Sequence, residues 1–325
     1  MAKVSVNLVT WNGSKYILDC LKYLFNQSFR DFSLLIIDNG STDDTLSLIK
    51  EKYPHLKIVT HSDNQGFAKA HNQAIHWTKS DYVLTLNQDI VLEPDFLERL
   101  VDFMENHPES GSVTGKLRRW QANQKTKYID SIGFQIYKNH RVVDLGSGEL
   151  DEGQYDDVSE IFGVSGAAPL YRRSALEEVM ENSQFFDEDF FSYKEDVDLA
   201  YRLQWQGWKS YKVPQAVAYH DRSVSGPVNQ MSKGQIAKNR RLKSKFANYH
   251  SYRNHLYMLT KNAPRLTGRI FFYELIKILY ISFAEPGTLK AFGEYWRNRK
   301  RFLEKRRVIM AGKKVEFTEV QKWLV

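Results

Sequence analysis

Strand-like and helix-like segments alternate over the first 90 or so residues, and this alternation restricts the possible folds more than any other feature of the chain. Short apolar runs rich in Val, Ile and Leu are separated by stretches whose apolar residues recur every three to four positions. Parallel strands need a crossover connection, usually a helix, so the pattern predicts an α/β fold with a mostly parallel sheet flanked by helices. The expected strands are 4–9, 32–37, 56–60 and 82–86, and the expected helices are 16–26, 43–52 and 67–78.

Basic residues gather toward the C-terminus. The 325 residues carry a net charge of +7, but residues 231–314 alone contain 21 Lys and Arg against 4 Glu. The remainder of the chain is therefore net acidic, and the turn-forming triplet Ser225-Gly226-Pro227 lies just before the change. We expect an α/β domain over residues 1–225 and a basic, mainly helical region over residues 226–325.

The sequence has features compatible with a cytoplasmic protein. Cys20 is the single cysteine, so no intrachain disulfide can form. The N-terminus runs straight into a strand pattern without the layout of a signal peptide. Glu274 and Lys277 interrupt the apolar run at 270–283, which argues against a membrane-spanning helix.

Polar residues follow the expected strands, and ligands bind such sheets at the carboxyl ends of the strands. Thr10 and Asn12 follow the first strand, Asp38 follows the second, and Asn64 follows the third. A carboxylate at position 38 can accept a hydrogen bond from a pyrimidine N3 or a ribose hydroxyl. A structural role for Asp38 is equally compatible with its place in the sequence.

Two acidic clusters lie about a hundred residues apart. Asp89 follows the fourth strand, where it either begins a turn or, with diphosphate oxygens and waters, binds Mg²⁺ or Mn²⁺. In the second cluster we expect Asp196 to act as a base, because nearby aromatic residues would desolvate it and raise its pKa. Ser192 and Glu195 have the spacing of a helix capping box, so Glu195 is expected to cap the helix and orient Asp196. An inverting sugar transferase needs this division between metal binding and proton transfer.

A single histidine, His220, follows a strand-like run at 213–219. A lone histidine in such a place more often has a structural role. The alternative is that His220 contributes to the metal site.

Over residues 4 to about 222, the order and spacing of these segments resemble family 2 glycosyltransferases with a GT-A fold. The resemblance implies that Thr10, Asn12 and Asp38 hold the base and ribose of a nucleotide. It extends this site to a further set of residues, Asn64, Gly66 and Asn72. The matching segments are 9–12, 38–43, 64–67 with Asn72, 87–89, 165–168, 195–199 and His220.

The resemblance also assigns the chemistry. It implies that Asp89 binds the metal and diphosphate, that Asp196 is the base, and that His220 completes the metal shell. The usual Asp-x-Asp motif is present here as Asn87-Gln88-Asp89, which places metal binding mainly on Asp89. Trp11 stands where tyrosine is common, and the Gln-x-x-Arg-Trp signature of processive synthases is missing, which argues against a polymer-extruding synthase.

The middle of the chain resembles a narrower branch. The segments 130–133, 141–146, 161–163 and 171–173 are similar to bacterial rhamnosyltransferases of O-antigen, cell-wall linker and related polysaccharide synthesis. This similarity implies dTDP-L-rhamnose as the donor, and a UDP-sugar remains the alternative.

The basic region bears on the acceptor. A mostly basic run at 297–301 lies between two aromatic residues, Trp296 and Phe302, after the apolar run at 270–279. This pattern is typical of a helix lying on an anionic membrane surface, such as the inner face of the cell membrane, where a polyprenyl-diphosphate-linked saccharide acceptor would be found. The alternative is a helical subdomain packed on the α/β domain.

Two other functions explain the sequence less well. A nucleic-acid-binding protein would explain the basic stretch but not the acidic residues at the strand ends, so we expect no nucleic-acid partner. A sugar nucleotidyltransferase would carry a glycine-rich loop with a basic residue after the first strand, where this chain has Thr10-Trp11-Asn12-Gly13.

Overall fold

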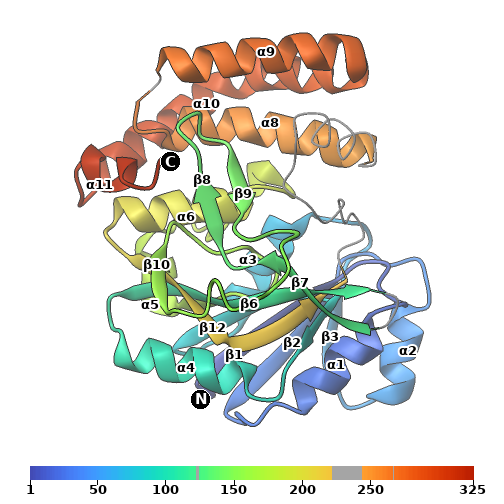
Figure 1. Ribbon diagram of the computed structural model, residues 1–325. Helices are drawn as coiled ribbons and strands as arrows, with labels where there is room; N and C mark the ends of the chain where they lie inside the picture. The colour runs from blue at the N-terminus through green and yellow to red at the C-terminus, as the bar shows by residue number, and fades with distance from the viewer. Residues whose placement is uncertain (122–123, 222–243, 266) are drawn as a thin grey trace.

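A computed structural model describes residues 1–121, 124–221, 244–265 and 267–325 (Figure 1). It confirms the predicted N-terminal alternation, and each boundary lies within two residues of the expected one. The strands are β1 Val4–Thr10, β2 Phe32–Asp38, β3 Ile58–Thr60 and β4 Tyr82–Asn87, and the helices are α1 Ile17–Phe25, α2 Thr45–Lys52 and α3 Phe67–Trp77.

The central sheet combines a parallel half with a mixed half. Strands β3, β2, β1 and β4 lie side by side in parallel, while β11 pairs antiparallel with β4 and β6, and β6 pairs in parallel with β12. Helices flank the sheet, so the predicted α/β architecture is confirmed (Figure 1). The later elements are β5 Ile90–Leu92, α4 Phe96–Asn106, β6 Ser110–Gln121, β7 Gln124–Ser131, β8 Phe134–Ile136, β9 Val142–Asp144, β10 Ser159–Ile161, β11 Leu170–Arg172, α5 Arg173–Glu178, the short η1 Glu188–Phe190, α6 Glu195–Trp205 and β12 Lys209–His220.

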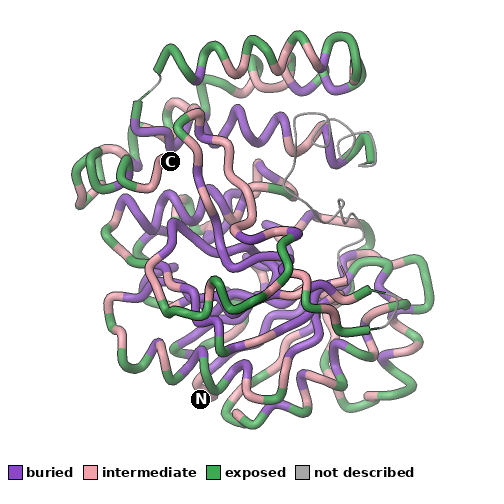
Figure 2. Tube along the Cα trace, viewed as in Figure 1, coloured by how far each residue is buried: buried purple, intermediate pink, exposed green. Residues whose placement is uncertain are grey.

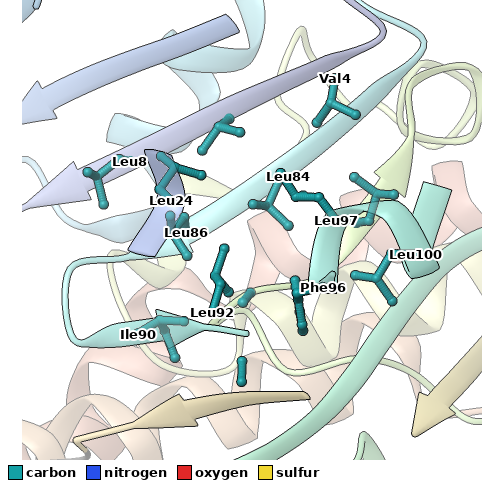
Figure 3. Close-up of a cluster of buried hydrophobic side chains, with 14 of the residues drawn as sticks. Val4, Leu8, Leu24, Leu84, Leu86, Ile90, Leu92, Phe96, Leu97 and Leu100 are labelled. Atoms are coloured by element: carbon teal, nitrogen blue, oxygen red, sulfur yellow. The ribbon is translucent and has the colours of Figure 1, made fainter. Parts of the chain in front are cut away.

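The main core lies between one face of the sheet and helices α1 and α4. Leu24 of α1 and Phe96 of α4 are fully buried with side chains of β1 and β4 (Figure 3). The removal of the apolar side chains of this core from water is the main favourable contribution to folding. This core fixes the strands whose carboxyl ends carry the polar residues discussed below.

In the described part of the C-terminal region, from residue 244 on, the α-helices are α8 Lys245–Asn262, α9 Gly268–Ala284, α10 Lys290–Gly312 and α11 Phe317–Gln321, with the short η2 Pro286–Leu289 before α10. The predicted basic, helical region is thus present, whereas the expected boundary near Ser225-Gly226-Pro227 lies outside the described residues. Tyr201 and Trp205 of α6 share an apolar core with Tyr257 of α8 and Phe302 of α10. Figure 2 shows that α6 is largely buried while much of α9 is exposed.

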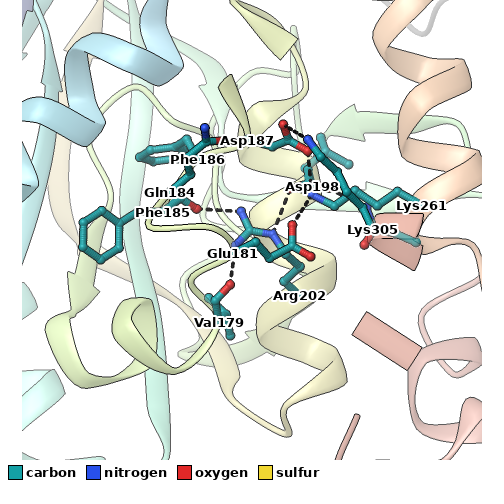
Figure 4. A network of polar contacts seen from close by, with 12 residues as sticks. Val179, Glu181, Gln184, Phe185, Phe186, Asp187, Asp198, Arg202, Lys261 and Lys305 are labelled. Carbon is teal, nitrogen blue, oxygen red and sulfur yellow. Dashed lines mark hydrogen bonds and ion pairs between the residues drawn. The ribbon is translucent and has the colours of Figure 1, made fainter. Parts of the chain in front are cut away.

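A buried charge network also joins α8 and α10 to the α/β domain (Figure 4). The Lys261 ammonium lies 2.6 Å from Glu181, 2.8 Å from Asp187 and 3.0 Å from Asp198. Lys305 of α10 adds a contact of 2.6 Å to Asp187. Burial alone would raise the pKa of Asp187, but these two lysines hold it well below its usual range.

Across the described residues, no helix combines the length and apolar character needed to cross a bilayer.

Candidate functional site

The carboxyl ends of β1, β2 and β4 meet at one edge of the sheet. Thr10 lies opposite Asp38 in the register of β1 and β2, and Val9 lies opposite Asn87 of β4. The Thr10 hydroxyl donates a hydrogen bond to the side-chain oxygen of Gln88. The structure therefore brings together the polar residues that follow three neighbouring strands.

Asp38 has one satisfied carboxylate oxygen and one unsatisfied oxygen. The Ser41 backbone N–H donates to Oδ2 at 3.1 Å. Oδ1 is buried and has no hydrogen-bond partner among the described residues. A buried acceptor without a donor is costly, and a ligand N–H or O–H would satisfy it. This geometry fits the predicted contact between Asp38 and a nucleotide.

Asn12 joins the loops that follow β1 and β2. Its backbone has a φ of 48°. Its N–H donates to the Ser41 hydroxyl at 2.9 Å, and its side-chain oxygen accepts from the Thr42 N–H at 2.8 Å. Asn12 thus lies beside the Asp38 loop, and its side-chain oxygen is hydrogen-bonded within the protein.

The predicted residues Asn64 and Gly66 shape the loop that leads into α3. Asn39, which the sequence analysis gave no role, donates to the Asn64 side-chain oxygen at 3.0 Å and accepts from the Gln65 N–H at 3.0 Å. Gly66 has a φ of 84°, and a Cβ there would lie 2.6 Å from the Phe191 carbonyl oxygen. Only glycine fits this close approach readily. These residues hold the loop in place beside the Asp38 side of the site.

Asn72 does not take the predicted nucleotide-binding role. Its amide nitrogen donates to the Phe186 carbonyl at 2.8 Å and to Glu188 at 3.0 Å. Its oxygen accepts from the backbone N–H groups of Phe185 and Phe186. An amide has two donors and two acceptor positions, so no group of Asn72 is left for a ligand. Its contribution is to tie α3 to the loop that precedes α6.

Gln88 occupies the variable middle position of the Asn87-Gln88-Asp89 segment, and its side chain binds the protein itself. Its side-chain oxygen accepts from the Trp11 N–H at 2.9 Å, and its nitrogen donates to the Trp11 carbonyl at 3.0 Å. Gln88 therefore fastens the loop after β1, and the Trp11 ring is left half-exposed at the edge of the site.

Asp89 and His220 lie together because β5 and β12 pair antiparallel, with Ile90 opposite His220. The distance from His220 Nε2 to Asp89 Oδ2 is 3.3 Å. On the other side of the ring, His220 Nδ1 lies 2.8 Å from Asp130 Oδ2. Burial alone would lower the pKa of His220, but the two carboxylates together raise it to about 10.

This arrangement fits a metal that is held partly by a substrate. Within the ranges described above, no group of three or more His, Cys, Asp or Glu side chains is placed to hold a metal by itself. Mg²⁺ is commonly bound by one or two protein ligands together with phosphate oxygens and waters. A second carboxylate behind a ligating histidine orients the ring, and Asp130 has that position here. Asp89 and His220 therefore match a divalent cation bound with a diphosphate.

The buried histidines predict a stability maximum near neutral pH for the metal-free protein. Burial lowers the pKa of His71 to about 3 and that of His140 to about 4. Since the unfolded value is about 6.5, the unfolded state binds more protons below that pH, and stability falls as pH drops from about 6.5 toward 4. The pKa of His220 is raised, so its contribution is complete below about 6.5 and is lost as pH rises toward 10.

Urea unfolding over pH 4 to 10 measures this profile. We expect the free energy of unfolding to decline on both sides, by up to about 1.4 kcal/mol per pH unit for each titrating group. A His220→Gln variant should lose the decline on the alkaline side that His220 causes. An unchanged alkaline limb in that variant contradicts the assignment.

Asp196 lies in the first turn of α6, with both carboxylate oxygens held. Oδ2 accepts from the Gly166 N–H at 2.9 Å, and Oδ1 accepts from the Val197 N–H at 2.8 Å. Burial raises the pKa of Asp196. The side chain is only partly buried, so it combines a fixed orientation with access for a hydroxyl group. The Ala167 carbonyl accepts from the Asn87 N–H, which connects this position to the end of β4.

The capping-box prediction for Glu195 is wrong. Lys194 is the N-cap residue of α6, no side chain caps the helix, and Glu195 is its first residue. The reason lies in the preceding turn, where Phe191, Tyr193 and Lys194 all have positive φ. Burial and the neighbouring Asp196 raise the pKa of Glu195 well above its usual range. Its position beside Asp196 remains compatible with an orienting role.

Helix α8 stabilises this turn. The buried Asn254 amide nitrogen lies 2.8 Å from the carbonyl oxygens of Phe190 and Ser192, and 2.6 Å from that of Tyr193. Arg253 donates to the Phe190 carbonyl at 3.1 Å. Positive φ costs free energy in residues other than glycine and persists where the surroundings impose it. The C-terminal region therefore helps to set the backbone immediately before Asp196.

The sequence analysis gave no role to Asp130, Asn39 or Asn254. Asp130 begins one of the segments, 130–133, that carry the resemblance to rhamnosyltransferases, and this was the available signal. Asn39 lies next to Asp38, within a segment that was noted as a whole. Asn254 lies in the basic region and had no local signal.

Comparisons with known proteins agree with this geometry. The sequence profile of Glycosyl transferase family 2 matches residues 5–180. An N-acetylglucosaminyl-diphospho-decaprenol L-rhamnosyltransferase from Mycobacterium tuberculosis is 28% identical over 240 residues, which cover 67% of this chain and 75% of that protein.

Two solved structures show the same fold at low sequence identity. GalNAc-T7 with UDP, GalNAc and Mn²⁺ has a TM-score of 0.60 at 13% identity, covering 96% of this chain and 58% of that chain. S. aureus TarS 1–349 in complex with UDP-GlcNAc has a TM-score of 0.54 at 17% identity, covering 99% and 90%. The fold is thus the GT-A fold of glycosyltransferases. Because the family profile spans more than half of its residues, this chain belongs to Glycosyl transferase family 2 and is a hexosyltransferase.

Proposed function

We propose that this enzyme transfers L-rhamnose from dTDP-L-rhamnose to a hydroxyl group of a polyprenyl-diphosphate-linked saccharide, with inversion at the anomeric carbon. The observation that carries the transfer chemistry is Asp196, whose carboxylate is oriented by two backbone N–H groups, partly exposed and raised in pKa. The rhamnosyl donor and the lipid-linked acceptor are supported by the relative from Mycobacterium tuberculosis. The corresponding synthesis is that of a bacterial cell-surface polysaccharide.

A UDP-sugar donor is the second candidate. One structural neighbour was solved with UDP-GlcNAc and another with UDP. Asp38 does not distinguish thymine from uracil, because its free oxygen can accept a hydrogen bond from N3–H of either base. The choice between the two donors therefore rests on a binding measurement.

The proposed site divides the substrate between three sets of residues. Thr10 and Asp38 face the base and ribose, with Asn12 supporting the loop. Asp89 and His220 would hold Mg²⁺ or Mn²⁺. When bound, such a cation neutralises the charge that develops on the leaving diphosphate.

The reaction follows as a single displacement. Asp196 accepts the proton of the acceptor hydroxyl, the oxygen forms a bond to the anomeric carbon, and the bond from that carbon to the diphosphate oxygen breaks. The nucleoside diphosphate leaves with the bonding electron pair, and the configuration inverts because attack and departure occur on opposite faces. Glu195, buried beside Asp196, supports its orientation in this proposal.

Calorimetric titration of dTDP, UDP and GDP in the presence of Mn²⁺ tests the proposed donor. We expect dTDP to bind most tightly and Asp89→Ala to weaken it by at least about tenfold, because the variant loses a metal ligand. Asp102→Ala, an exposed change on α4, is the matched control and should bind as the parent does. Preference for UDP would replace the donor, and a folded protein that binds no nucleotide would overturn the proposal.

The lipid-linked acceptor places the enzyme at a membrane. We propose that it acts from the cytoplasm as a peripheral protein on the inner face of the cell membrane. The anionic lipid headgroups of that face attract basic segments, and the C-terminal region is strongly basic.

A further inference from the structure

In helix α9 the charged side chains face the protein and the apolar side chains face outward, which is the reverse of an ordinary surface helix. Within residues 270–284 the charged side chains are Glu274 and Lys277, and both face α8. Glu274 Oε1 lies 2.8 Å from His255 Nε2, and the Lys277 ammonium lies 4.7 Å from the centre of the Tyr252 ring. A helix on the surface of a soluble protein normally directs its charges to water.

The outward side of α9 is a continuous apolar face. Phe272 is 66% exposed, Ile276 is 64% exposed and Phe283 is 88% exposed, whereas Glu274 and Lys277 are 13% and 16% exposed. We define the apolar face of α9 as Phe271, Phe272, Leu275, Ile276, Leu279 and Phe283. Single exposed apolar residues are common, but a contiguous face of this kind marks a site of contact.

The surrounding charge indicates what covers this face. Exposed Arg269 lies at the start of α9 and exposed Lys290 follows its end, while Arg297 and Lys300 are exposed on α10. Glu294 of α10 is turned inward, 2.9 Å from Arg253. A second copy of the chain would bring two strongly basic surfaces together, which is unfavourable. An anionic lipid surface complements both the apolar face and the bases beside it.

The size of α9 defines how it would contact a bilayer. Its 17 residues make a helix about 25 Å long, and Glu274 and Lys277 remain paired on its inner side. A helix with one apolar face lies in the interfacial plane with that face buried in the boundary between headgroups and acyl chains. Long basic side chains at its ends reach the headgroups.

We propose that the apolar face of α9 inserts into the interface of an anionic bilayer and is the element that docks the enzyme on the membrane. This inference rests on the proposed function, because docking on a membrane would bring the enzyme to its proposed lipid-linked acceptor. It adds the docking element and its orientation: the apolar face of α9 toward lipid, and α8 toward the protein.

Flotation of the full-length protein with vesicles tests the proposal. The probes are vesicles of phosphatidylcholine alone and of phosphatidylcholine with phosphatidylglycerol. We expect the parent to float with the anionic vesicles. The double variant Phe272→Ser/Ile276→Ser should lose at least about tenfold in apparent vesicle affinity, because two exposed apolar side chains that would insert into the bilayer are removed. Trp77→Ser, which changes another exposed large apolar side chain, on α3, is the control and should float as the parent does.

Three results would overturn the inference: no flotation of the parent, equal flotation of the double variant, or equal binding to neutral vesicles. Light scattering behind a sizing column tests the alternative that a second copy of the chain covers this face. A parent dimer that the double variant converts to a monomer assigns the apolar face of α9 to a second copy instead. Calorimetric binding of dTDP distinguishes a failure of the docking proposal from a failure of the proposed function. The double variant should bind dTDP as the parent does. Loss of flotation with retained dTDP binding supports the docking role, whereas absent dTDP binding in the parent bears on the proposed function.

Discussion

Replacing Asp196 by asparagine is expected to lower the rate of sugar transfer by a factor of about 10² to 10⁴, the usual contribution of a general base. The amide cannot accept the proton of the acceptor hydroxyl, yet it has nearly the same shape as the carboxylate. Its oxygen can still accept from the Gly166 N–H, which now binds Oδ2. The measurement is the initial rate of dTDP release from dTDP-rhamnose with a lipid-linked acceptor, alongside calorimetric binding of dTDP.

Nucleotide binding separates a chemical role for Asp196 from a structural one. We expect Asp196→Asn to bind dTDP as the parent does, and Asp102→Asn on α4 to leave both rate and binding unchanged. Because burial raises the pKa of Asp196, the parent's rate should fall as pH drops through a value above the usual 4 or so. A variant that keeps the parental rate would show that another group is the base.

Replacing Lys261 by methionine is expected to destabilise the protein by about 3–5 kcal/mol, the cost of removing one partner from a buried ion pair. The change leaves Glu181, Asp187 and Asp198 with less compensating charge in the interior. The free energy of unfolding in urea gives the effect directly. Lys300→Met on the exposed side of α10 changes the same atoms at the surface and should cost less than about 0.5 kcal/mol.

The position of Lys261 also predicts that Lys261→Met lowers the rate of sugar transfer. Asp198, which accepts from Lys261, is two residues from Asp196 on the same helix. A Lys261→Met protein that is as stable as the parent would contradict the role assigned to this network. A protein that is destabilised but fully active when folded would limit that role to stability.

The first half of the fold was predictable because its signals are local. Apolar periodicity within windows of about ten residues located β1 to β4 and the helices between them, and the order of strands along the chain placed Thr10 and Asp38 at one edge of the sheet. Asp89 and His220 were named separately from the sequence. Their contact depends on antiparallel pairing between β5 and β12, which are more than a hundred residues apart.

The errors arose where a distant partner decides the local structure. Ser192 and Glu195 have the spacing of a capping box, but α8 imposes a different turn through Asn254. Asn72 matches a family segment, yet its amide is used by the loop at 185–188. Lys261 was counted among the bases of the C-terminal region, and nothing in the neighbouring sequence indicates that it is fully buried. Neither the composition of the chain nor the spacing of its motifs shows which distant residues will contact these side chains in the folded protein.

The placement of Asp196 and Asp198 on one short helix has a consequence for how enzymes of this kind diversify. Asp198 is bound by Lys261 and Asn262 of α8, so the helix that carries the proposed base in its first turn is held by residues of the C-terminal region. A recombination event that exchanged residues 244–325 alone would remove Lys261 and Lys305 from the buried carboxylates of Asp187 and Asp198, and Arg202 of α6 would remain beside Asp198. A new C-terminal region is therefore expected to be inherited together with residues 181–205, and laboratory chimaeras should place their crossover before residue 181.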